Sequence, residues 1–191
     1  MITKICGIKE SDTLLCCEKN NVNFFGMIFY PKSPRNILLD QAIILQKYSK
    51  NLNINGVAVF VNNEISNTVD LIKELELKFV QLHGDEDNQY IKILKELNVK
   101  IIKKISIKNQ SDLYNYKNYE DADYFLFDYK PNKNELPGGN SKSFDWNIIK
   151  ELNIEKPWFL SGGINLDNIK LIINEINPFG VDLSSGVEKK L

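Results

Sequence analysis

Histidine and cysteine, which supply many of the metal ligands in proteins, are scarce in this chain. Among its 191 residues there are one histidine, His83, and three cysteines, Cys6, Cys16 and Cys17. Two of the cysteines are adjacent, which excludes the disulfide framework of a secreted domain. No pair of cysteines has the spacing of a zinc site, and no second histidine could complete one. We therefore expect free thiols, a cytoplasmic location, and neither a metal nor another cofactor.

An excess of charge of one sign and long hydrophobic runs are also missing. The 24 Lys and Arg residues nearly balance the 25 Asp and Glu, which leaves a formal net charge of -1. Such a surface does not gather nucleic acid or anionic lipid. No apolar run approaches the length that crosses a bilayer. We expect neither nucleic acid nor a membrane as a partner, and one domain over residues 1–191.

What the sequence does contain is a regular alternation of two kinds of segment. Short apolar runs typical of buried strands occur at residues 2–6, 24–29, 56–61, 79–83, 100–105, 124–128, 158–161 and 181–183. Segments with apolar residues at helical spacing lie between most of them, at residues 11–20, 39–52, 64–76, 86–98 and 165–177. This order predicts an α/β fold with a parallel sheet. The strand count favours a closed (β/α)8 TIM barrel over an open doubly wound sheet.

Two stretches depart from this alternation. Residues 130–143, KPNKNELPGGNSKS, form a long irregular segment between a strand and a helix, which we interpret as a functional loop. After the last strand only SSGVEKKL remains, which is too short for a full outer helix. We therefore expect a short or missing final outer helix, either native to the barrel or the remainder of a longer chain.

The residues suited to chemistry follow the predicted strands. In a TIM barrel the reacting groups gather at the C-terminal ends of the strands. Cys6 ends the first strand and Asp128 ends the sixth. Two turns of small residues, SGGI at 161–164 and DLSSG at 182–186, follow the last two strands and offer backbone amides to an anion. The sequence thus predicts a thiol, a carboxyl and an anion site at one end of the barrel.

Ordinary structural explanations compete with these roles. A lone cysteine on a strand is most often a small buried apolar residue, and a strand-end aspartate is commonly a helix cap or turn former. We interpret Asp145 as such a cap, because a helical run follows it directly. Cys16 and Cys17 are expected to pack within the first helix.

Seven segments, taken in order, resemble the phosphoribosylanthranilate isomerase family of tryptophan biosynthesis. They are KICGI at 4–8, GMIFYPKSPR at 26–35, QLHGD at 81–85, FLFD at 125–128, GGNSKSFDW at 138–146, FLSGGI at 159–164 and GVDLSSGVE at 180–188. The resemblance spans nearly the whole chain and implies an Amadori rearrangement. In that reaction an N-glycoside of anthranilate and ribose 5-phosphate becomes an open-chain aminoketone. The loop departs from the family pattern, with Asn140 and Ser141 where a second glycine usually precedes the lysine.

The resemblance also implies a role for individual residues. Asp128 is the acid that protonates the ring oxygen of the ribose, and Cys6 is the base that removes a proton from the neighbouring carbon. Arg35 faces the anthranilate carboxylate. The remaining substrate contacts are Gly162, Gly163, Ser184 and Ser185 for the phosphate, with His83 and Asp182 elsewhere on the substrate. We expect a nearby cation such as Lys4 to draw Cys6 toward thiolate.

Two other functions compete with this one. The ProFAR isomerase of histidine biosynthesis performs the same rearrangement, but it has two phosphate sites and an aspartate where Cys6 stands. An inactive phosphate-binding scaffold is the second alternative, and the joint retention of Cys6, Asp128 and Arg35 argues against it. The predicted partner is a small-molecule substrate, and the expected assembly is a monomer or a homodimer.

Overall fold

Eight parallel strands form a closed barrel in the computed structural model, which describes residues 1–132, 134–139, 141–150 and 153–188. The strands are β1 (Ile2–Cys6), β2 (Phe24–Phe29), β3 (Asn55–Phe60), β4 (Phe79–Leu82), β5 (Lys100–Ile107), β6 (Tyr124–Tyr129), β7 (Trp158–Leu160) and β8 (Gly180–Leu183). Strand β8 pairs with β1 and closes the ring. The predicted TIM barrel is confirmed, and an open sheet is excluded.

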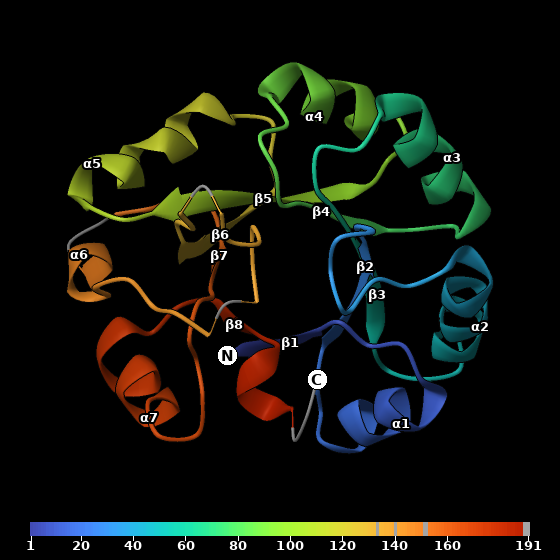
Figure 1. Cartoon of the computed structure of the whole chain (residues 1–191), viewed down its shortest axis with the longest axis horizontal. Helices are drawn as coiled ribbons and strands as arrows, with labels where there is room; N and C mark the ends of the chain where they lie inside the picture. The colour runs from blue at the N-terminus through green and yellow to red at the C-terminus, as the bar shows by residue number, and fades with distance from the viewer. Residues whose placement is uncertain (133, 140, 151–152, 189–191) are drawn as a thin grey trace.

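The helices surround the strands as an outer layer (Figure 1). They are α1 (Ser11–Lys19), α2 (Leu39–Ser49), α3 (Ile65–Glu74), α4 (Asn88–Lys95), α5 (Gln110–Leu113), α6 (Asn147–Lys150) and α7 (Ile169–Leu171). A 3-10 helix, η1 (Tyr114–Asn118), continues α5, and a π-helical turn, η2 (Ile172–Ile176), continues α7. The five helical segments expected from the sequence are present and shorter than expected, whereas α5 and η1 were not predicted.

The described residues after β8 form one 3-10 turn, η3 (Ser185–Val187). This agrees with the expected short final helix as far as Glu188, and residues 189–191 lie outside the described part of the chain. None of the described helices has both the length and the apolar character needed to cross a bilayer.

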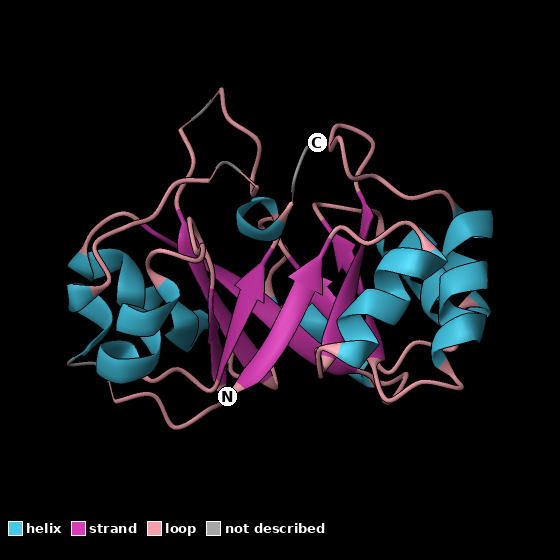
Figure 2. Ribbon diagram, turned by 90° about the horizontal axis from the view of Figure 1, so that it is seen from below, coloured by secondary structure: helices cyan, strands magenta, loops and turns pink. Residues whose placement is uncertain are grey.

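Along the barrel axis, the interior is lined by apolar side chains in one layer and by polar side chains in the next layer toward the C-terminal ends of the strands. Val57, Ile102, Leu126 and Phe159 form an interior cluster of buried side chains. Because alternate residues of a strand point to the same side, Lys104 follows Ile102 into the interior and Asp128 follows Leu126. The strands run toward the end of the barrel opposite the N-terminus (Figure 2). Polar groups are therefore concentrated at the C-terminal ends of the strands, above an apolar base.

Candidate active site

Two adjoining cavities lie at the C-terminal ends of the strands. The first occupies about 590 Å³, including space open to solvent, and its lining includes Cys6, Arg35, His83, Asp128 and Asp182. The second is lined by the turns after β7 and β8, including Gly162, Gly163, Ser184 and Ser185. Asp128, Asp182 and Ser184 line both cavities. Every site residue predicted from the sequence therefore lines one connected depression.

Cys6 ends β1 opposite Gly26 on β2, its register partner. A Cβ atom at position 26 would lie 2.7 Å from the Cys6 sulfur, so the absence of a side chain there makes room for the thiol. The residue is 9% exposed but lines the first cavity. Its sulfur thus sits in a narrow space that is open toward the cavity.

A buried ion pair lies directly below the thiol. Lys4 Nζ donates hydrogen bonds to both carboxylate oxygens of Asp182, at 2.9 and 2.8 Å, and also interacts with the Cys6 side chain. Burial alone would lower the pKa of Lys4, but Asp182 and Cys6 outweigh it and leave that pKa above its usual value. Lys4 is therefore a permanent cation beside Cys6.

This cation does not bring the thiol to thiolate. Burial raises the pKa of Cys6 to about 11, and the opposing effect of Lys4 is smaller. Lys4 does favour the thiolate, as expected, but its effect is smaller than that of burial, so the resting thiol stays protonated. Arg35 is a second cation that lowers the pKa of Cys6, but Lys4 and Arg35 together do not reverse the effect of burial.

Asp128 is held at the end of β6 by two groups. Its Oδ1 accepts a hydrogen bond from the Tyr129 backbone N–H at 2.8 Å, and its Oδ2 lies 3.4 Å from Nε2 of His83. Gly162 approaches closely from the turn after β7, with a φ of +90° that favours glycine. A Cβ atom there would lie 3.0 Å from Oδ1.

Arg35 is buried, with 5% exposure, and its guanidinium is fixed by a bidentate ion pair. Nε and Nη2 donate to the two carboxylate oxygens of Glu188, at 2.6 and 2.7 Å. Nη1 lies on the side of Gly139, a residue of the loop over the cavity. The planar group is thus held in one orientation at the rim of the first cavity.

The second cavity has the features of an anion site. Gly162 and Gly163 both have positive φ, at +90° and +66°, so their turn is tightly curved. Ser185 Oγ contacts Ser141 Oγ at 2.8 Å, and the backbone of Lys142 lies against the glycine turn while its ammonium group pairs with Glu135. Helix α7 begins at Ile169 rather than near Asn165. The site therefore rests on backbone turns, and the short 3-10 turn η3 begins at Ser185 in its lining.

The irregular segment at 130–143 does cover the site, as interpreted from the sequence. Leu136, Pro137, Gly138 and Gly139 line the first cavity. The Pro137 carbonyl accepts a hydrogen bond from Lys104 Nζ at 3.1 Å. The departure from the family pattern at Asn140 lies outside the described residues.

The smaller expectations have mixed outcomes. Asp145 Oδ1 accepts a hydrogen bond from the Asn147 N–H at 3.0 Å, at the start of α6, which confirms the cap.

Cys17 is buried, but Cys16 is exposed and does not pack as expected. Among the described residues, no group of His, Cys, Asp and Glu side chains could hold a metal ion.

Comparison with known families and structures agrees with this geometry. The family described as N-(5'-phosphoribosyl)anthranilate (PRA) isomerase matches residues 3–190. An N-(5'-phosphoribosyl)anthranilate isomerase of Brucella canis is 39% identical over 188 residues, which is 97% of this chain and 84% of the relative.

This chain belongs to the N-(5'-phosphoribosyl)anthranilate isomerase family.

Solved structures of isomerases from this family share the fold. That of Thermotoga maritima superposes with a TM-score of 0.87 at 32% identity, covering 100% of this chain and 91% of its own. Another structure, a complex with reduced 1-(o-carboxyphenylamino)-1-deoxyribulose 5-phosphate, has a TM-score of 0.82 at 30% identity and covers 100% of this chain and 90% of its own. The chain is thus an isomerase, of an enzyme class that interconverts aldoses and ketoses.

Three residues of this isomerase site were missed by the sequence analysis. Gln81, Lys104 and Glu188 contact the predicted residues or the loop that covers them. Gln81 carried a usable signal, because an amide that alternates with apolar residues along a strand points into the barrel with them. Glu188 carried none, because its partner Arg35 is distant in sequence.

Proposed function

We propose that the chain converts N-(5'-phosphoribosyl)anthranilate into 1-(2-carboxyphenylamino)-1-deoxyribulose 5-phosphate in tryptophan biosynthesis, with Asp128 as acid and Cys6 as base. The observation that carries the proposal is the pair of connected cavities. A thiol, a carboxyl and a fixed guanidinium line one of them, and two tight turns line the other. A substrate with a carboxylate at one end and a phosphate at the other fits this arrangement.

Asp128 and Cys6 act in successive steps of the reaction. Asp128 gives its proton to the ring oxygen of the ribose, the bond from that oxygen to C1′ breaks, and C1′ forms an iminium with the anthranilate nitrogen. Cys6, as thiolate, then removes the proton on C2′. The electron pair of that C–H bond forms the C1′–C2′ double bond and neutralises the nitrogen. The resulting enolamine gains a proton at C1′ and loses one from O2′ to give the ketone.

The high pKa of Cys6 fits a base that ionises only during turnover. In the unliganded protein the thiol stays protonated, since burial raises its pKa to about 11. Ring opening creates a positive iminium next to the sulfur, and a cation at that distance favours loss of the thiol proton to solvent in the open cavity, which leaves the thiolate. The iminium also makes the C2′ proton more acidic, so the thiolate can remove it.

The two ends of the substrate are bound by different means. Arg35 presents N–H donors for the anthranilate carboxylate, and Glu188 keeps the guanidinium plane fixed. Backbone N–H groups of Gly162, Gly163 and the turn at Ser184 suit the phosphate. Binding energy from the phosphate holds the ribose while the reaction proceeds at its other end.

The test is a fluorescence assay that follows the loss of the anthranilate glycoside. Cys6→Ser and Asp128→Asn should each lower kcat by about 100- to 10,000-fold, the usual contribution of a general base or acid. Cys16→Ser is the matched control, because Cys16 is exposed on α1 and away from both cavities. Full activity in both site variants would exclude the assigned roles. Turnover of the ProFAR aminoaldose in a separate assay for that compound would identify a second substrate.

The remaining expectations concern assembly and location. The three cysteines are free thiols, which supports a reducing compartment such as the cytoplasm. A structure of the Thermotoga maritima relative is described as one of monomers made from a dimeric enzyme. Light scattering on purified protein separates the monomer from the homodimer for this chain.

A further inference from the structure

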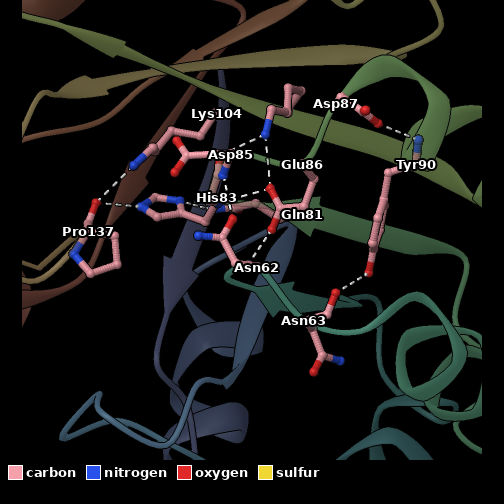
Figure 3. A network of polar contacts seen from close by, with 12 residues as sticks. Asn62, Asn63, Gln81, His83, Asp85, Glu86, Asp87, Tyr90, Lys104 and Pro137 are labelled. Carbon is pink, nitrogen blue, oxygen red and sulfur yellow. Dashed lines mark hydrogen bonds and ion pairs between the residues drawn. The ribbon is translucent and has the colours of Figure 1, made fainter.

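His83 is held at both ring nitrogens, in a chain of contacts that runs from the barrel interior to the covering loop (Figure 3). Nδ1 lies 2.8 Å from Nε2 of Gln81. Nε2 lies 3.2 Å from the Pro137 carbonyl oxygen and 3.4 Å from Oδ2 of Asp128. The imidazole is 11% exposed, so its hydrogen bonds must be made largely within the protein.

The Pro137 carbonyl decides which nitrogen carries the proton. A carbonyl oxygen can only accept a hydrogen bond, so the facing Nε2 must donate. Burial lowers the pKa of His83, and the ammonium groups of Lys104 and Lys4 lower it further against the opposing effect of Asp128. The ring is therefore neutral near pH 7, and its single proton lies on Nε2.

Gln81 completes this arrangement from the other side. With the proton on Nε2, Nδ1 carries a lone pair and needs a donor, which the Gln81 amide supplies at 2.8 Å. Gln81 is 1% exposed and lines the first cavity. Its Oε1 has no hydrogen-bond partner among the described residues. The position of the proton on His83 therefore requires the Gln81 NH2 group, and not its oxygen, to face Nδ1. No hydrogen bond to Oε1 from another described residue requires the opposite orientation.

We propose that Gln81 is a positioning residue for the acid: its amide N–H locks His83 in the Nε2–H form, which directs an N–H at Oδ2 of Asp128. The proposal rests on the role proposed above for Asp128. With Tyr129 N–H on Oδ1 and His83 N–H toward Oδ2, each carboxyl oxygen faces one donor. The carboxyl plane is then fixed relative to the substrate.

The alternative tautomer would disturb this geometry in two places. A proton on Nδ1 would leave a lone pair on Nε2 facing the Pro137 carbonyl oxygen, which can only accept, and would remove the N–H directed at Oδ2 of Asp128. The contact with Pro137 becomes repulsive, and both Asp128 and the covering loop lose a donor. The tautomer therefore matters for the acid and for closure of the site over the substrate.

Nuclear magnetic resonance can test the tautomer without any substrate. His83 is the only histidine in the chain, so the imidazole nitrogen signals of labelled protein need no assignment. We expect the neutral Nε2–H form in the wild type, a mixture of tautomers in Gln81→Met, and a proton on Nδ1 in Gln81→Glu. A wild type with the Nδ1–H form would overturn the proposal, whatever the enzyme's activity.

Steady-state kinetics tests the effect on the acid. We expect Gln81→Met to lower kcat by about 10- to 100-fold with little change in KM, by analogy with the loss seen when partners that orient metal-bound histidines are removed. Gln46→Met on α2 is the matched control, because its Oε1 is also buried without a partner among the described residues and it lines neither cavity. An unchanged kcat, or a raised KM alone, would overturn the positioning role. An inactive wild type with the Nε2–H form would instead remove the proposed function.

Discussion

Cys6 shows how strongly its surroundings control a single side chain. The thiol has a neighbouring ammonium group, yet its pKa is raised to about 11 because burial outweighs that charge. The balance between these two effects depends on distances and solvent exclusion, which a sequence does not contain. The identity of the base was therefore predictable from the KICG motif, whereas its resting protonation state was not.

The raised pKa of Cys6 predicts an alkaline dependence of the reaction. Because the base is protonated at neutral pH, kcat/KM should keep rising above pH 8 as the thiolate fraction grows toward pH 11. Lys4→Met should move the thiol titration to higher pH, since Lys4 lowers the pKa of Cys6. Thiolate ultraviolet absorbance in a Cys16→Ser, Cys17→Ser background measures the titration directly. A thiol that titrates below pH 8 would contradict this prediction.

The same shift makes a prediction about stability. The unfolded thiol titrates near 9.0 and the folded one near 11. Below pH 9 the thiol is protonated in both states, so its contribution to the free energy of unfolding does not change with pH. Between pH 9 and 11 the unfolded state loses its proton first, and the folded state loses stability as pH rises. Urea titrations at several pH values between 9 and 11 should show a smaller loss of the free energy of unfolding in Cys6→Ser than in the wild type.

Arg35 gives a prediction about substrate recognition. Arg35→Lys should raise KM by about 10- to 100-fold, because an ammonium group cannot pair with Glu188 through two N–H groups and still present a fixed donor to the carboxylate, and a charged hydrogen bond contributes roughly 1.5–3 kcal/mol. The analogue phosphoribosylaniline lacks the carboxylate and should be bound equally by the variant and the wild type. An equal loss of binding for both compounds would place Arg35 away from the carboxylate.

At the scale of elements, the strands were predicted well and the helices less so. Buried strands are continuous apolar runs, so all of them could be located from the sequence. Helix α5 and η1 were missed because the segment after β5 has few apolar residues at helical spacing. Asn109 and Asp112 form a capping box at its start, and that pattern was available in the sequence. The π-helical turn after α7 has no evident cause in the sequence.

The contact between β1 and β2 at the thiol predicts a specific sensitivity. Gly26→Ala should lower the free energy of unfolding by about 1–3 kcal/mol, because the new methyl group would lie 2.7 Å from the Cys6 sulfur. Adding Cys6→Ala removes that sulfur and should restore part of the stability. Denaturant unfolding of the two single variants and the double variant measures the coupling. If the changes in the free energy of unfolding of the two single variants add up to that of the double variant, the methyl group does not press on the Cys6 sulfur.

At the scale of the whole molecule, the Lys4–Asp182 pair joins the first strand to the last. Both side chains are buried, at 0% and 5% exposure. Lys4→Met should destabilise the protein by about 3–5 kcal/mol, because it leaves an unpaired buried carboxylate. Lys4→Met combined with Asp182→Leu should recover much of this loss without recovering activity. Chemical denaturation and the fluorescence assay measure the two effects separately.

The assignment of residues 1–191 to one domain stays a prediction. A closed ring of strands has no internal boundary at which one part could unfold alone while the rest keeps its pairing. Far-ultraviolet circular dichroism and tryptophan fluorescence should therefore report coincident unfolding transitions. Two separated transitions would indicate independent units.

Closure of the ring through β1 and β8 has a consequence for synthesis on the ribosome. β1 emerges first, but its second neighbour is the last strand to be translated. Throughout elongation the nascent sheet keeps two unpaired edges, which are prone to aggregation. Lys4 cannot form its ion pair until Asp182 has been synthesised. The positive charge of Lys4 beside the thiol is therefore neutralised only after translation of β8. The catalytic centre is therefore complete only after β8 has been synthesised and has paired with β1.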